Sequence, residues 1–166
     1  MDGLILTPIS HADVVGRLNR FAQDGLPVVA LNNDIASRRL CYVGCDYTGS
    51  GRTAAQMMGY LCGGQGKVAV VAGSLSMLGH RQRAEGFRSQ LETEFPAMSL
   101  AEVVENNDDD ACSFEEVSRA LAAHPAIDSL YFCAGGVAGG VRAALASGPK
   151  TIVTCDLTPE IRRLLE

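Results

Sequence analysis

The chain has 166 residues, 47% of them hydrophobic, and a formal net charge of −5, which are ordinary values for one globular domain or two small lobes. The negative charge argues against a nucleic-acid-binding surface, and no apolar run is long enough to span a bilayer. The first apolar run, Leu4–Leu6, is short and follows no basic residues, so we predict neither a signal peptide nor a membrane partner.

The six cysteines form no CxxC pair and no zinc-ligand spacing. We therefore expect reduced structural thiols and a cytoplasmic location. No spacing of histidines or acidic residues indicates a metal ligand set, a catalytic group or a cofactor, so none is predicted.

The chain alternates predicted strands and helices from end to end, because short apolar runs alternate with segments of helical apolar spacing. The predicted strands are residues 3–7, 27–31, 40–43, 67–72, 100–104, 129–133 and 151–155. The predicted helices are residues 12–23, 48–61, 79–94, 113–123, 137–146 and 159–166. Ser113 with Glu116 matches a capping box, and Thr158 before Pro159 matches an N-cap.

The strands are nearly continuous apolar runs, which is typical of parallel sheets buried on both faces. Strand–helix alternation predicts a doubly wound α/β fold, in which ligands bind beyond the carboxyl ends of the strands. The candidate positions that follow strands include Asn32–Asp34, Gly73–Ser76, Ala134–Gly136 and Asp156.

Several glycine-rich stretches fail the phosphate-binding and dinucleotide-binding patterns, and no GxSxG or HExxH motif occurs. The acidic run Asp108–Asp110 lacks EF-hand spacing, so a solvated loop is the favoured interpretation over a divalent-ion site.

Three nitrogen-rich side chains, His80, Arg81 and Arg83, stand where the strand 67–72 gives way to a helix. The planar guanidinium of arginine suits vicinal hydroxyls, carboxylates or phosphates. Two residues apart on a helix, the arginines would point about 200° apart. An ordinary alternative is a helix start held by ion pairs, with Arg83 or Arg88 pairing Glu85 or Glu92.

Most of the chain resembles the effector-binding core of LacI-type (lactose-repressor-type) regulators, and is similar also to periplasmic sugar-binding proteins. The stretches that carry the resemblance include GLPVVALNNDI, YVGCDYTGSGRTAAQMMGYL, GKVAVVAGSLSMLGHRQRAEGFRSQL and TIVTCDLTPEIRRLL. The resemblance implies a periplasmic-binding-protein-like type I fold with the ligand in a cleft between two lobes. Residues 1–45 would form part of the N-terminal lobe, residues 46–156 a complete C-terminal lobe, and residues 157–166 the start of a return segment.

By the same resemblance, ligand contacts fall on Asn32, Asn33 and neighbouring Asp34, on Arg81 or Arg83, and on Asp156. Ser76, His80 and Gly135, which also follow strands, complete the predicted ligand-binding set. Cys155 stands where relatives have an aromatic residue that stacks on the sugar.

The resemblance predicts the sensor domain of a transcriptional regulator that binds a sugar-like effector. It implies a homodimer, and operator DNA bound through a domain outside this chain. One alternative is a periplasmic sugar-binding protein of a transporter. Another is a nucleotide-dependent enzyme on a doubly wound fold, against which the missing GxGxxG pattern argues.

Overall fold

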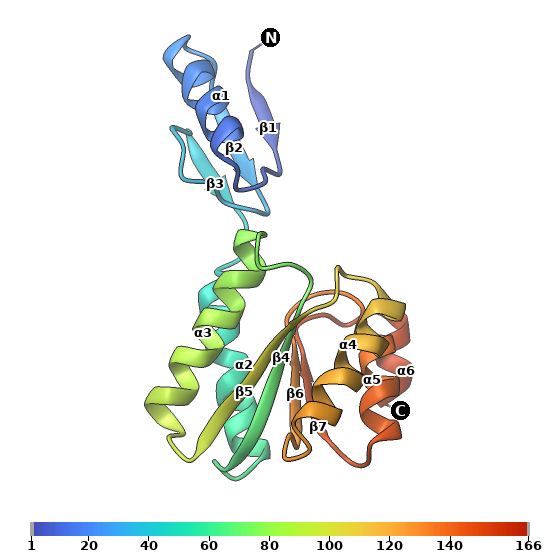
Figure 1. Ribbon diagram of the computed structural model, residues 1–166. Helices are drawn as coiled ribbons and strands as arrows, with labels where there is room; N and C mark the ends of the chain where they lie inside the picture. The colour runs from blue at the N-terminus through green and yellow to red at the C-terminus, as the bar shows by residue number, and fades with distance from the viewer. Residues whose placement is uncertain (1, 166) are drawn as a thin grey trace. The chain divides into compact units, whose positions relative to one another are not determined.

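The computed structural model describes residues 2–165, which form two parallel sheets and six helices (Figure 1). The strands are β1 (Leu4–Leu6), β2 (Val28–Leu31), β3 (Cys41–Val43), β4 (Gly66–Ala72), β5 (Met98–Glu105), β6 (Ser129–Phe132) and β7 (Thr151–Thr154). The helices are α1 (Ala12–Gln23), α2 (Tyr47–Leu61), α3 (Leu78–Glu94), α4 (Asp110–Ala123), α5 (Val137–Ala146) and α6 (Pro159–Leu165). The order of elements confirms the predicted doubly wound α/β fold.

The chain divides into two compact units. Unit 1 runs through Asp46 and includes Ser76–Gly79, whereas unit 2 comprises Tyr47–Leu75 and the chain from His80 onward. Unit 2 includes α6, because Ile161 of this helix is buried in its core. Within residues 2–165, no helix is both long and apolar enough to cross a membrane.

Unit 1 is a three-stranded parallel sheet in the order β1-β2-β3, with α1 packed on one face. His11 is the N-cap of this helix, and its Nδ1 accepts a hydrogen bond from the Asp13 amide at 3.3 Å. The core of the unit consists of four buried side chains, Leu18, Val28, Ala30 and Ile35. Side chains of alternate strand residues, among them Ile5, Leu31 and Val43, point to the other face and are exposed.

Unit 2 has three layers, with α2 and α3 on one face of a four-stranded sheet and α4, α5 and α6 on the other (Figure 1). The strand order β5-β4-β6-β7 places β4 and β6 in the centre, and the side chains of β6 are all buried. A separate apolar core fills each face, which explains the near-continuous apolar runs of the strands.

One predicted helix start is wrong and another is confirmed. Helix α4 begins at Asp110 because Asp109 is its N-cap, with the carboxylate accepting a hydrogen bond from the Cys112 amide at 2.8 Å. Ser113, the predicted cap, lies inside the helix and is fully buried. Thr158 does cap α6, because its hydroxyl accepts a hydrogen bond from the Ile161 amide at 3.2 Å.

Candidate functional site

The carboxyl ends of all four parallel strands in unit 2 meet at one edge of the sheet. Gly73–Leu75 follow β4, Asn106–Asp108 follow β5, Cys133–Gly136 follow β6, and Cys155–Asp156 follow β7. Since ligands of doubly wound sheets bind at this edge, the polar groups there are the candidates for a site.

Arg83 on α3 is held at this edge by two contacts. Its Nη1 donates a hydrogen bond to the Cys133 carbonyl at 3.0 Å, and its guanidinium lies 4.7 Å from the centre of the Tyr47 ring. Its Nε is buried and has no hydrogen-bond partner among residues 2–165. The arginine is therefore fixed in place, and since only its Nη1 forms a hydrogen bond to the described residues, its Nη2 group keeps donor capacity for a ligand.

Asn106 and Asp108 fix the loop after β6 against the loop after β5. Fully buried Asn106 donates from Nδ2 to the Gly135 carbonyl at 2.8 Å, and the Gly135 amide donates to Asp108 Oδ1 at 2.7 Å. Asn106 Oδ1 also accepts from the Asp108 amide at 3.0 Å, which holds Asp108 at a φ of 58°. The exposed Asp108 carboxylate thus has a fixed position with acceptor capacity to spare.

Asp156 lies at the end of β7 and is exposed. Together with Gly135 it lines a cavity of about 120 Å³ between the loops that follow β6 and β7. We refer to Arg83, Asn106, Asp108, Gly135 and Asp156 as the sheet-end cluster. It combines a guanidinium donor with carboxylate and amide groups at a single edge of the sheet.

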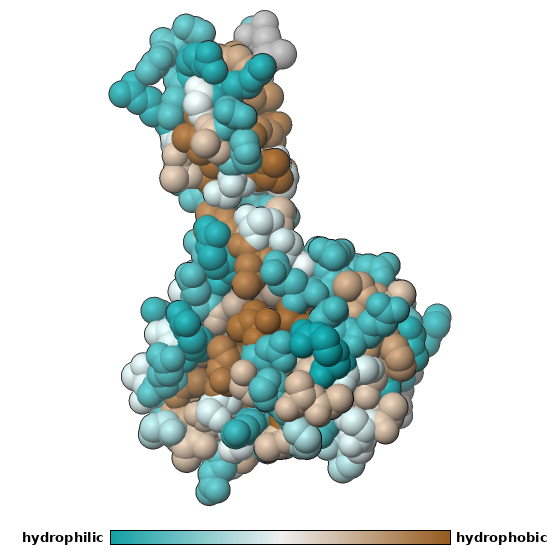
Figure 2. All heavy atoms as spheres, in the orientation of Figure 1, coloured by the Kyte–Doolittle hydropathy of each residue, from teal (hydrophilic) through white to brown (hydrophobic). Residues whose placement is uncertain are grey.

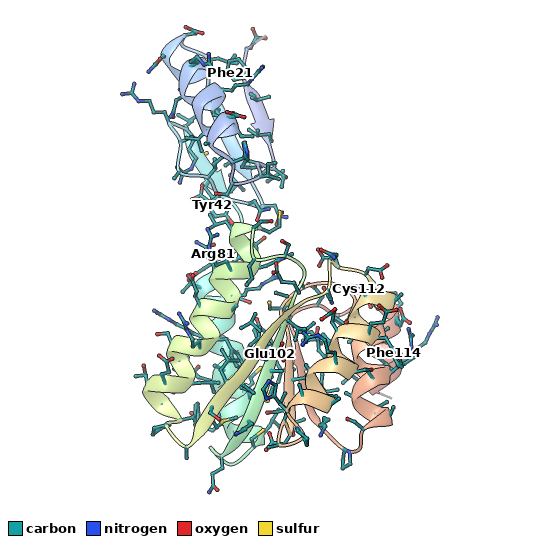
Figure 3. The ribbon with its side chains drawn as sticks, in the orientation of Figure 1. Phe21, Tyr42, Arg81, Glu102, Cys112 and Phe114 are labelled. Atoms are coloured by element: carbon teal, nitrogen blue, oxygen red, sulfur yellow. The ribbon has the colours of Figure 1, made fainter. Side chains whose placement is uncertain are left out.

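The structure separates the two candidate arginines. Arg81, near the start of α3 (Figure 3), donates to the Leu75 carbonyl at 3.2 Å and lines a different cavity, of about 200 Å³, beside the edge strand β5. The floor of that cavity includes Leu100 and Val103, in the region where Figure 2 shows brown apolar side chains next to α3. Arg83 thus belongs to the sheet-end cluster and Arg81 does not.

The alternative of an ion-paired helix start is not observed. Neither Arg83 nor Arg88 forms an ion pair with Glu85 or Glu92 in the part of the chain that the structure describes. His80 stays close to the strand end, with its Nδ1 accepting a hydrogen bond from the Ser74 amide at 3.1 Å.

Four further predicted residues, Asn32, Asn33, Asp34 and Ser76, belong to unit 1. Asn33 is buried, and the Asp34 carboxylate accepts hydrogen bonds from Arg39 at 2.6 Å and from the Ile35 amide at 2.8 Å. Asn32 adopts a φ of 63°, and its carbonyl accepts a hydrogen bond from the Tyr42 hydroxyl at 2.9 Å. Their role in ligand binding stays a prediction.

Asn106 and Asp108 are absent from the predicted set, although they follow β5 just as the predicted residues follow other strands. The acidic run is more than a solvated loop, because each of its carboxylates accepts a backbone hydrogen bond. The donors are Gly135 for Asp108, Cys112 for Asp109 and Gly139 for Asp110. Among the described residues, no group of three or more potential ligands could hold a metal ion.

Two cysteines beside the cluster are kept as thiols by their surroundings. Burial raises the pKa of Cys133 to about 12 and that of Cys155 to about 11, while the nearby Arg83 guanidinium acts in the opposite direction on both. Burial likewise raises the pKa of the Tyr131 hydroxyl. These groups are protonated at neutral pH, so neither thiolate nor phenolate adds negative charge to the site.

This arrangement of groups suits hydrogen bonding to a polar molecule. A fixed guanidinium donates, fixed carboxylates accept, and together they complement a ligand that carries several hydroxyl groups. The fold and the cluster are of the kind in which doubly wound proteins bind small molecules at the carboxyl ends of their strands. The chain belongs to the periplasmic binding protein domain family, whose model matches residues 1–166.

Solved structures of sugar-binding proteins share the fold. The chain is 25% identical to GanP, a glucose-galactose binding protein from Geobacillus stearothermophilus, with a TM-score of 0.91, covering 99% of this chain and 60% of that one. It is also 25% identical to a solute-binding protein of an ABC transporter from Burkholderia graminis in complex with D-arabinose, with a TM-score of 0.88 and coverages of 99% and 60%. A sugar-binding protein of a sugar ABC transporter from Bacillus halodurans is 25% identical, with a TM-score of 0.81 and coverages of 98% and 57%.

The chain therefore spans about three-fifths of the length of these structures. A comparison with curated protein sequences gave no significant match.

These comparisons correct the predicted function. The main expectation, a sensor domain of a LacI-type regulator, is wrong, because the matched structures are sugar-binding and solute-binding proteins, two of them of ABC transporters. Operator DNA and a homodimer were expected as partners only because the chain was expected to be a regulator. With that expectation corrected, nothing here supports either partner. The sequence could not separate the two classes, because its stretches resemble both of them.

Proposed function

We propose that this chain is the sugar-binding part of an extracytoplasmic solute-binding protein that delivers a monosaccharide to a transporter. The observation that carries the proposal is the fixed Arg83 guanidinium, with its unused donor capacity, beside the strand ends that carry Asp108 and Asp156. Sugars present adjacent hydroxyls, and each can donate to a carboxylate while accepting from a guanidinium. The binding of D-arabinose by one structural relative supports the same ligand class.

Asn32, Asn33 and Asp34 are proposed as further sugar contacts contributed by unit 1. Of the three, Asp34 has both carboxylate oxygens already engaged, by Arg39 and by the Ile35 amide. A protein with the proposed role works outside the cytoplasm. We therefore propose an extracytoplasmic location, which differs from the cytoplasmic location expected from the cysteines. Fractionation of cells that express the gene, with a cytoplasmic enzyme as marker, tests this location.

The sugar proposal is tested by calorimetric titration of the full chain with D-arabinose, D-glucose and D-galactose. At least one of them is expected to bind with a measurable heat and to raise the melting temperature of the protein. Arg83→Ala is expected to lower the affinity about 100-fold, because losing charge-assisted hydrogen bonds to a ligand costs about 1.5–3 kcal/mol each.

Arg81→Ala is the matched control, since Arg81 lies on the same helix but lines a different cavity. The sugar affinity of this control variant should stay within about twofold of that of the unchanged protein. A tenfold change would correspond to about 1.4 kcal/mol. Arg83→Lys keeps the charge but not the planar fork, so it tests whether the shape of the guanidinium matters for binding. Circular dichroism of each variant shows whether a loss of affinity reflects misfolding. Absence of binding to all three sugars, or equal losses in both alanine variants, would overturn the proposal.

A further inference from the structure

Strands β6 and β7 end in cysteines that are neighbours across the sheet. Their parallel register pairs Phe132 with Thr154, so the next residues, Cys133 and Cys155, stand opposite one another. Neighbouring strands lie about 4.8 Å apart, which falls within the range of roughly 4.4–6.8 Å between the Cα atoms of disulfides. We propose that Cys133 and Cys155 are a reversible dithiol–disulfide site.

Both thiols lie on the same face of the sheet. Cys133 is buried in the core on the α2 and α3 side, together with Tyr131 and Val153. Cys155 lines a cavity of about 220 Å³ that is lined also by Tyr131, Val153 and residues of α2. Since side chains alternate between the faces of a strand, Tyr131 and Val153 place both cysteine side chains on the α2 side. The pair thus has the same-face placement that a disulfide requires.

The two thiols differ in access, and this sets the order of the reaction. Cys133 is fully buried, whereas Cys155 is partly exposed and lines the cavity. An external disulfide therefore meets Cys155 first. The charge of Cys155 also raises the pKa of Cys133, as expected of two sulfur atoms close together.

With oxidised glutathione as the oxidant, the small fraction of Cys155 that is deprotonated attacks one glutathione sulfur, forms a mixed disulfide and releases one glutathione thiol, so the exchange is slow at neutral pH and faster as the pH rises. The Cys133 thiolate then attacks the Cys155 sulfur and releases the second glutathione. The two protein thiols lose two electrons and two protons, and the glutathione disulfide gains them. Dithiothreitol reverses the exchange.

Peptide mapping of the folded full chain tests the site. The chain is incubated with oxidised glutathione, quenched with acid, denatured, alkylated with N-ethylmaleimide and digested with trypsin. Cys133 then falls on peptide 120–142 and Cys155 on peptide 151–162, each of which contains a single cysteine. The expected result is one cross-linked species, lighter by two hydrogens than the two peptides together, with loss of both alkylated peptides and recovery of both after reduction.

Single variants give a second, asymmetric readout. Cys133→Ser is expected to leave Cys155 as a stable mixed disulfide with glutathione, whereas Cys155→Ser leaves the buried Cys133 unmodified. Cys62, at the start of the turn after α2, is the internal control: it is partly exposed as Cys155 is, so it is expected to carry N-ethylmaleimide or glutathione but to enter no cross-linked peptide.

In the unchanged protein, full alkylation of both cysteines after oxidation would overturn the proposal. So would a glutathione adduct that persists on Cys155, or a disulfide from Cys155 to a cysteine other than Cys133. The unchanged protein alone decides these outcomes, so a variant that fails to fold does not affect the test. No sugar is involved, so the result is independent of the proposed transport function.

Discussion

The two units cover their parallel sheets to different extents. In unit 2, helices lie on both faces of the sheet, and the β4 side chains Val70 and Val71 are at most 1% exposed. In unit 1, α1 covers one face, while Leu31 and Val43 on the other face are 43% and 52% exposed. Some of the exposed apolar side chains of unit 1 are visible as brown spheres in Figure 2. Strands of similar apolar sequence therefore differ in burial because the helices around them differ.

This difference bears on the two sets of predicted ligand residues. The sheet-end cluster follows strands that are packed on both faces, and hydrogen bonds to the backbone of the loop after β6 hold Arg83, Asn106 and Asp108. Asn32–Asp34 follow a strand with one open face. We expect the cluster in unit 2 to keep its geometry without ligand, and rigid placement of binding groups favours affinity.

The largest expected effect concerns glycines in the helices of the two units. A methyl group at Gly51 of α2 would overlap the backbone carbonyl of Arg83 on α3, whereas nothing lies near the corresponding position of Gly16 in α1. Gly51→Ala should therefore lower the free energy of unfolding by about 1–3 kcal/mol through overpacking. Gly16→Ala should raise it by about 0.5–1 kcal/mol, because alanine favours the helix.

Urea denaturation followed by circular dichroism measures both glycine variants. If both variants change the free energy of unfolding in the same direction, the close approach of α2 and α3 does not explain why a glycine occupies position 51. Sugar affinity is a second measurement, because the methyl group of Gly51→Ala would press on the backbone carbonyl of Arg83, the residue proposed to bind the sugar. A loss of affinity in Gly51→Ala without unfolding would show that the helix contact positions the arginine.

The order of strands and helices could be predicted because it depends on local pattern. Each apolar run with its flanking turn residues specifies a strand without reference to the rest of the chain. The start of α4 could not be placed, because Asp109 and Ser113 both suit a cap and the choice depends on how the loop after β5 folds. Asn107 and Asp108 turn the chain there with φ values of 54° and 58°.

The candidate site could be predicted only in part. The strand-end rule finds Asp156 and Gly135, and the same rule applied to β5 would have found Asn106 and Asp108. The choice between Arg81 and Arg83 depends on where α3 begins and on its rotation over the sheet, and tertiary packing sets both. The proposed ligand class rests on the groups that the fold brings together, which no single stretch of sequence contains.

A smaller effect is expected at Tyr47, the first residue of α2, whose ring lies under the Arg83 guanidinium. Tyr47→Leu should weaken sugar binding about fivefold, because a cation–π contact of this kind is worth about 1 kcal/mol. Tyr47→Phe keeps the ring and should retain more of the affinity than Tyr47→Leu. Tyr60→Leu, at an exposed position of the same helix, is the control and should leave the sugar affinity unchanged.

A double variant distinguishes positioning from direct contact at Tyr47. If Tyr47 acts through Arg83, adding Tyr47→Leu to Arg83→Ala should lower the affinity no further. Additive losses measured by calorimetry would instead show that the Tyr47 ring contacts the sugar itself.

The smallest expected effect tests the open face of unit 1 directly. Val43→Thr, on the exposed face of β3, should change the free energy of unfolding by less than about 0.5 kcal/mol. The same substitution at Val70, fully buried in β4, should cost about 1–3 kcal/mol because it buries a hydroxyl in an apolar core. Equal costs at the two positions, measured by urea denaturation, would mean that the exposed face of unit 1 is covered in solution. Unequal costs would show that burial of the strand decides the outcome, since the residue type and the substitution are identical at both positions.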